Sequence, residues 1–112
     1  MRWEKLSSLG QELPEVTEET WYRTPALKVR GKGFVRLKED GRSVVFMLGS
    51  VDEQQFLIGS QPDLYYITSH YVGWPAVLAR LAKLRVAEAR QRIEESWRVK
   101  APKTLIKRFD TQ

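Results

Sequence analysis

Residues 27–48 read LKVRGKGFVRLKEDGRSVVFML and predict three antiparallel strands joined by two tight turns. The turns are indicated by Gly31 and Gly33, and by the Asp40-Gly41 pair, which is a strong hairpin signal. The first two strands alternate apolar and basic residues, the pattern of a sheet with one buried face. We therefore predict a core face with Leu27, Val29, Val35 and Leu37, and an exposed basic face with Lys28, Arg30, Arg36 and Lys38.

The flanking segments predict helices and further strands. Residues 2–12 carry apolar side chains at helical spacing and stop before Pro14. Ser50 and Glu53 form a capping box that begins a short helix ending near Gly59. The other expected elements are strands at 44–48, 64–67 and 76–81, the last also compatible with a helix, and a long helix from Val86 that ends before Pro102. The order α-β-β-β-α-β-β-α indicates a two-layer α+β fold, with an antiparallel sheet covered by helices on one face.

Length and composition restrict the class of protein. A chain of 112 residues is long enough for one domain with its own core, so we expect a single domain over residues 1–112. The absence of cysteine excludes disulfides and thiolate metal sites. No apolar run is long enough to cross a bilayer, and the N-terminal stretch is too polar for a signal peptide. We expect a cytoplasmic protein with no membrane partner.

The charge is positive and unevenly distributed. The chain has 19 Lys and Arg against 14 Asp and Glu, a net charge of +5. Residues 23–42 contain seven bases and two acids, and we expect residues from about 102 to 112 to form a basic C-terminal tail. Such an imbalance attracts phosphate polymers. The alternative is an ordinary solvated surface, because a net charge of this size is common among soluble domains.

Residues 70–81 read HYVGWPAVLARL and predict a shaped aromatic loop that leads into a strand. Tyr71 and Trp74 have two open roles, stacking on nucleic-acid bases or anchoring the loop in the core. His70 is the only histidine and has no nearby carboxylate in sequence, so we expect it to bind or to order the loop, without metal binding or catalysis. The aromatic residues predicted to lie in the core are Trp3, Phe56 and Trp97.

Three blocks of the chain resemble the MmcQ/YjbR family. They are LPEVTEETWYRTPALKVRGKGFVRL at 13–37, LYYITSHYVGWPAVLARL at 64–81 and SWRVKAPKTL at 96–105. The resemblance implies a secretion-chaperone-like α+β fold, which agrees with the element order predicted above. It also implies DNA binding through a double-wing arrangement, a description of the family that itself rests on the fold.

The leading hypothesis is a non-enzymatic nucleic-acid-binding protein, with DNA the expected partner and no cofactor. No phosphate loop, dinucleotide fingerprint or nucleophile elbow suggests an enzyme. The basic sheet face can bind phosphates only if its side chains are free of Asp and Glu partners. Two alternatives remain open, a protein-binding adaptor or chaperone-like protein and a small-ligand pocket beneath the aromatic loop, and the sequence does not fix the oligomeric state. The predicted nucleic-acid-binding residues are Lys28, Arg30, Lys32, Arg36, Lys38, His70, Tyr71, Trp74 and Arg80.

Overall fold

One antiparallel sheet of six strands runs through the molecule in the spatial order β1-β2-β3-β4-β6-β5. The computed structural model describes residues 1–112. The strands are β1 (Val16–Trp21), β2 (Thr24–Val29), β3 (Lys32–Leu37), β4 (Ser43–Met47), β5 (Tyr65–Tyr66) and β6 (Ala76–Arg80). The helices are α1 (Trp3–Gly10), α2 (Val51–Ser60), α3 (Val86–Lys100) and α4 (Lys103–Asp110), with 3-10 turns η1 (Ser69–Tyr71) and η2 (Leu81–Lys83). The predicted α+β class is confirmed.

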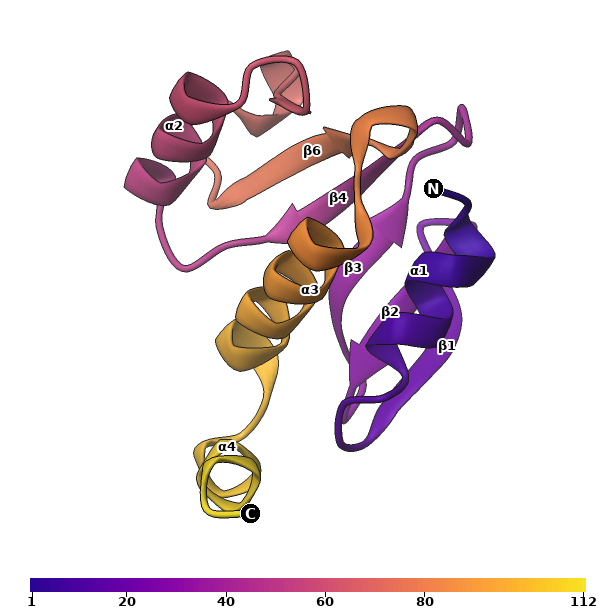
Figure 1. Cartoon of the computed structure of the whole chain (residues 1–112), viewed down its shortest axis with the longest axis vertical. Helices are drawn as coiled ribbons and strands as arrows, with labels where there is room; N and C mark the ends of the chain where they lie inside the picture. The colour runs from indigo at the N-terminus through magenta and orange to yellow at the C-terminus, as the bar shows by residue number, and fades with distance from the viewer.

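The main core lies between the sheet and two helices. Helix α3 packs on β3 and β4, and α1 packs on β2 and against α3, so both helices cover the same face of the sheet (Figure 1). Leu27, Val29 and Val35 are fully buried there, as the alternation predicted. Trp97 is also fully buried, and its indole nitrogen donates to the carbonyl oxygen of Pro14 at 3.1 Å. None of the helices is both long and apolar enough to cross a membrane.

Two elements were not predicted. Strand β1 reads VTEETW and is polar on both faces because it lies at the edge of the sheet, so it carries no hydrophobic alternation. The segment expected to be a basic tail folds into α4, which begins directly after Pro102. Leu105 of this helix is buried. The ring of Phe109, also in α4, meets that of Trp97 edge-on with 5.2 Å between the ring centres. The helix is therefore held to the core by its apolar side.

The expectation that Phe56 belongs to the core is wrong. Its residue surface is 70% exposed, because the buried positions of α2 are Gln54 and Leu57 instead. Half of the predicted capping box is present, because the Ser50 hydroxyl accepts from the Glu53 amide at 3.1 Å, whereas the Glu53 carboxylate contacts Arg92 instead of the Ser50 amide. Sequence therefore placed the start of this helix correctly but not its orientation.

The outer face of the sheet, turned away from α1 and α3, carries a second and smaller apolar cluster. Its buried members are Val45, Ala76 and Leu78, and Met47, Tyr66 and Tyr71 pack against them. A β-bulge between β2 and β3 sets Arg36 opposite Ala26, and the register with β4 sets it opposite Val45. Arg36 therefore lies at the border of this cluster, where it is 8% exposed.

Candidate functional site: an aromatic groove

A groove of about 530 Å³ crosses the outer face of the sheet, and we call it the aromatic groove. Its floor comes from β4, the start of β6 and Arg36 of β3. One wall is the turn between β1 and β2, and the other is the loop from His70 to Pro75. The lining residues are Trp21, Tyr22, Arg36, Glu39, Val45, Met47, Leu48, His70, Tyr71, Trp74, Pro75, Ala76 and Lys100.

The first wall is built on a strained hairpin turn. Trp21 pairs with Thr24, so Tyr22 and Arg23 form a two-residue turn, with φ angles of 55° and 65°. Such turns favour Asn-Gly, because a left-handed conformation costs other residues about 1–2 kcal/mol each. Strain of this kind concentrates at functional sites. Here it displays the Tyr22 ring, which is 68% exposed and lies 5.4 Å from the Trp21 ring, centre to centre.

The indole of Trp21 lies against the backbone of β3. A side-chain carbon added at Gly33 would collide with the six-membered part of that ring. Glycine at this position therefore leaves the space in which Trp21 lies against the sheet. The first wall of the groove thus lies directly against β3, the strand that contributes Arg36 to the floor.

The second wall is fastened by a buried glutamine that sequence reasoning did not identify. Gln54 is fully buried, and its side-chain nitrogen lies 2.9 Å from the carbonyl oxygen of Tyr71 and 2.8 Å from those of Trp74 and Ala76. The loop is thus held by its backbone, so the Trp74 side chain is not needed to fasten it. Of the two roles left open for Trp74, anchoring in the core is excluded, because its residue surface is 65% exposed.

A buried polar network fixes the helix that carries Gln54. Arg92 of α3 is 7% exposed and binds Glu53 of α2 at 3.0 Å. The hydroxyl of Tyr65 in β5 donates to Glu88 of α3. Burial, followed by this contact with Glu88, raises the pKa of Tyr65 above its ordinary range, so the phenol stays protonated as a donor. The network joins α2, α3 and β5, and so sets the position of the second wall.

Arg36 joins the two walls. Its guanidinium donates to the Tyr71 hydroxyl at 3.1 Å and lies 5.2 Å from the centre of the Tyr22 ring. It also donates to one carboxylate oxygen of Glu39 at 3.1 Å, while Lys38 reaches the other oxygen at 3.4 Å. The Glu39 amide, followed by Arg36 and Lys38, lowers the pKa of the Glu39 carboxyl below its usual value. This acid is therefore ionised at neutral pH.

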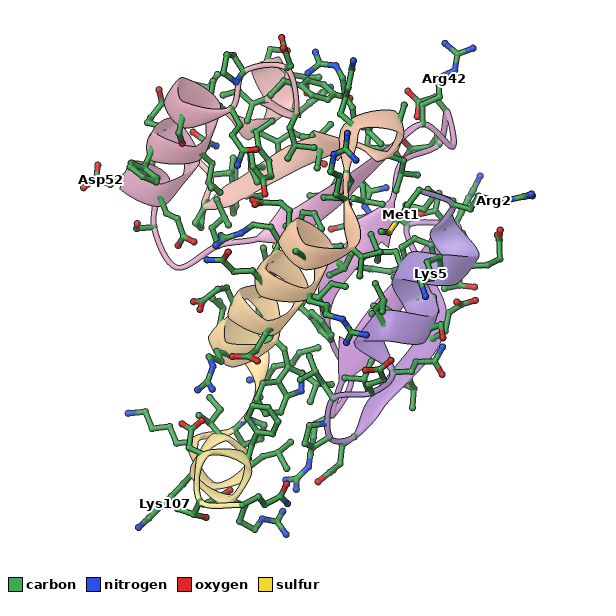
Figure 2. The ribbon with its side chains drawn as sticks, viewed as in Figure 1. Met1, Arg2, Lys5, Arg42, Asp52 and Lys107 are labelled. Carbon is green, nitrogen blue, oxygen red and sulfur yellow. The ribbon has the colours of Figure 1, made fainter.

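The predicted exposed basic face on β2 and β3 is wrong for three of its four bases, and only Lys28 has no acidic partner. Arg36 is buried, Arg36 and Lys38 both pair with Glu39, and Arg30 pairs with Glu15 at 2.7 Å. The prediction failed because the turn after β3 places Glu39 beside Arg36 and Lys38. In addition, the unpredicted β1 brings Glu15, which directly precedes it, beside Arg30. Bases without acidic partners are spread over the molecule instead. Arg42 and Lys107, for example, project at opposite ends of its long axis (Figure 2).

The sequence model of a family described as YjbR matches residues 11–99. The chain belongs to the YjbR family. Two relatives are the uncharacterized proteins Rv2570 of Mycobacterium tuberculosis (strain ATCC 25618 / H37Rv) and Mb2600 of Mycobacterium bovis (strain ATCC BAA-935 / AF2122/97). Each is 43% identical over 53 residues, which cover 47% of this chain and 41% of the relative. The chain thus matches less than half the length of these relatives, and the resemblance to MmcQ/YjbR proteins is confirmed.

This YjbR-family fold divides the predicted binding residues into three groups. The first is at the aromatic groove, where Lys38 lies 5.8 Å from the Tyr71 ring centre, and consists of Arg36, Lys38, His70, Tyr71 and Trp74. The second lies toward the turn between β2 and β3 and consists of Lys28, Arg30 and Lys32. The third is Arg80, at the other end of β6 from the groove, where its guanidinium lies 4.2 Å from the Tyr66 ring centre.

The groove also contains residues that were not predicted. These are Trp21, Tyr22, Glu39 and Lys100. Trp21 and Tyr22 lie in a polar run with no turn signal. The only signal in the sequence was that two large aromatic residues are adjacent there. His70 is exposed, and no group of three or more potential His, Cys, Asp or Glu ligands comes together in the protein. The geometry therefore offers ring faces and a few charges rather than a metal centre.

Replacing Gln54 tests how the loop from His70 to Pro75 is held. We expect Gln54→Ala to destabilise the protein by about 2–3 kcal/mol, because a buried polar contact is lost and carbonyl groups lose a donor. Urea unfolding measures the change, and amide exchange over residues 71–76 should accelerate. Gln91→Ala, at an exposed position of α3 whose side chain makes no hydrogen bond, should cost less than about 0.5 kcal/mol. Equal effects of the two variants would contradict the assigned role.

Relieving the strained turn should stabilise the protein. Arg23→Gly removes the cost of a left-handed arginine but loosens the unfolded chain, so we expect a net gain of about 0.5–1 kcal/mol in urea unfolding. Gly31→Ala is the control, because Gly31 also has a positive φ, of 81°, with no neighbouring atom to obstruct a methyl group. That variant should lose stability. A loss of stability in both variants would show that contacts of Arg23 stabilise the protein by more than its strained conformation costs.

Proposed function

We propose that this protein binds single-stranded nucleic acid, without enzymatic activity, by stacking bases on the rings of the aromatic groove. The observation that carries the proposal is the pair of exposed rings, Tyr22 and Trp74, which line one groove from opposite walls. Base stacking on aromatic side chains contributes about 1–3 kcal/mol per base and tolerates any sequence. Because the backbone that carries each ring is held in place before binding, little backbone entropy is lost when a base stacks on the rings.

The distribution of charge favours single strands over duplex DNA. A duplex needs a row of free bases facing its phosphates, and the expected row on β2 and β3 is largely neutralised by Glu15 and Glu39. Two cations have no acidic partner, Lys100, which lines the groove at the end of α3, and Arg23, which lies in the strained turn of the first wall. The net charge of +5 adds a long-range attraction for any nucleic acid.

DNA is our first choice of nucleic acid, in line with the DNA-binding description that the MmcQ/YjbR resemblance implies. We also propose a cytoplasmic location, which the cysteine-free composition supports. Both proposals concern the domain in these 112 residues.

A small-ligand pocket is the second candidate. The groove volume of about 530 Å³ lies within the range of small-molecule sites, and apolar residues such as Val45, Met47 and Ala76 form its floor. A flat aromatic solute would use the same rings as a base. The two functions differ in one property: affinity for a single strand rises with its length, whereas affinity for one small molecule does not.

Fluorescence anisotropy with a labelled oligothymidylate about 12 nucleotides long tests the proposal. We expect Trp74→Ala to weaken binding by about 1–3 kcal/mol, because one stacking surface is lost. Phe56→Ala is a matched control, since Phe56 is as exposed as Trp74 but lies on α2 outside the groove, and it should bind as the wild type does. If two phosphates are neutralised, log K against log salt should have a slope of about −1.4.

Two results would contradict this function. Absence of binding by the wild type at low salt would exclude nucleic acid, because electrostatic attraction is then strongest. The small-ligand pocket would then be the leading candidate. Equal weakening by Trp74→Ala and Phe56→Ala would place binding outside the groove. Circular dichroism establishes that each variant is folded.

A further inference from the structure

The floor of the aromatic groove contains a charged group that is almost out of reach of water. The side chain of Arg36 is 9% exposed, and a buried guanidinium needs partners to offset its lost hydration. Tyr71 supplies one hydrogen bond, and the Tyr22 ring covers the guanidinium at 5.2 Å. Only Glu39 supplies a negative charge. The groove therefore has a fixed positive centre between its two aromatic walls.

The acid that neutralises this centre is itself largely in water. The side chain of Glu39 is 62% exposed, and it lies in the connection between β3 and β4. Each of its carboxylate oxygens contacts one cation, Arg36 at 3.1 Å and Lys38 at 3.4 Å. An exposed carboxylate gains little from such pairing and can return to water at small cost. Two cations that each contact one oxygen of a carboxylate can contact two oxygens of a phosphate in the same way.

We propose that Glu39 occupies an anion-binding position in the aromatic groove, and that a phosphate of the bound strand displaces it from Arg36 and Lys38. The proposal rests on the proposed function and deepens it, because it assigns a phosphate subsite beside the stacking rings. Glu39 acts as an internal competitor that keeps Arg36 neutralised while the groove is free. The low pKa of its carboxyl keeps the competitor charged at neutral pH. Tyr71, already bonded to Arg36, lies beside the same position.

The decisive variant is Glu39→Gln, which keeps the shape of the side chain and removes its charge. We expect it to bind the oligothymidylate about fivefold more tightly, because the phosphate no longer has to displace a charged competitor from the two cations. The salt dependence should steepen by about 0.7, the value for one more neutralised phosphate on a single strand. Lys38→Met should have the opposite effect and weaken binding about fivefold.

Glu95→Gln is the charge-matched control. Glu95 is exposed on α3, on the far side of the sheet from the groove, and has no ion pair. This variant changes the net charge by the same amount, and its effect should stay below about twofold because salt screens distant charges. Equal tightening by Glu39→Gln and Glu95→Gln would overturn the subsite, since net charge alone would then explain both.

Small probes separate a phosphate subsite from a carboxylate subsite. Thymidine 5′-monophosphate should bind Glu39→Gln more tightly than it binds the wild type, whereas uncharged thymidine should not distinguish them. A gain for 2-naphthoate without a gain for the nucleotide would overturn the phosphate assignment and favour an aromatic carboxylic acid as ligand.

The outcomes also separate this inference from the function on which it rests. If the wild type binds the oligothymidylate but Glu39→Gln binds no more tightly, the subsite is wrong and the function stands. If neither protein binds, the function fails and the subsite fails with it. Because glutamine keeps an oxygen that can accept from Arg36, circular dichroism should show Glu39→Gln folded, and Lys38→Met provides an independent test of the same position.

Discussion

The carboxamide of Gln54 connects the core of this protein to its outer surface. It holds the backbone of the loop that carries Tyr71 and Trp74, and it does so from a fully buried position on α2. The tyrosine in turn bonds to Arg36, and Arg36 orders Glu39 and lies beneath the ring of Tyr22. The two walls of the aromatic groove thus depend on one chain of contacts that starts in the core.

This arrangement explains how large aromatic groups remain exposed in a fixed place. An aromatic ring in a loop usually reaches the core, because burying its apolar surface is favourable. Here the loop is held by hydrogen bonds to its backbone, and the opposite turn is held by strand pairing on either side of Tyr22 and Arg23. Neither ring is needed to secure its own segment, so both are available to a ligand.

Sequence predicted the fold well because the central strands alternate cleanly and their turns use Gly and Asp-Gly. The edge strand β1 was not predicted, because it is polar on both faces and shows no alternation of apolar and polar residues. The aromatic loop was located, but its orientation depends on Gln54, whose contacts are distant in sequence. The basic face was mispredicted because strand alternation says nothing about the acids that a turn or a neighbouring strand brings beside each base. Tyr22 and Arg23 are unusual residues for a two-residue turn, so no sequence rule predicted this turn. Such departures from local preference are expected at functional sites.

The central claim is that nucleic acid binds in the aromatic groove, and the indole N–H signals of the four tryptophans test it most directly. Trp21 and Trp74 line the groove, whereas Trp3 and Trp97 are buried and donate internally to Glu18 and Pro14, both at 3.1 Å. Two-dimensional 1H–15N NMR during addition of oligothymidylate should shift the signals of Trp21 and Trp74 and leave those of Trp3 and Trp97 in place. Binding that leaves the Trp21 and Trp74 signals unmoved would contradict the account.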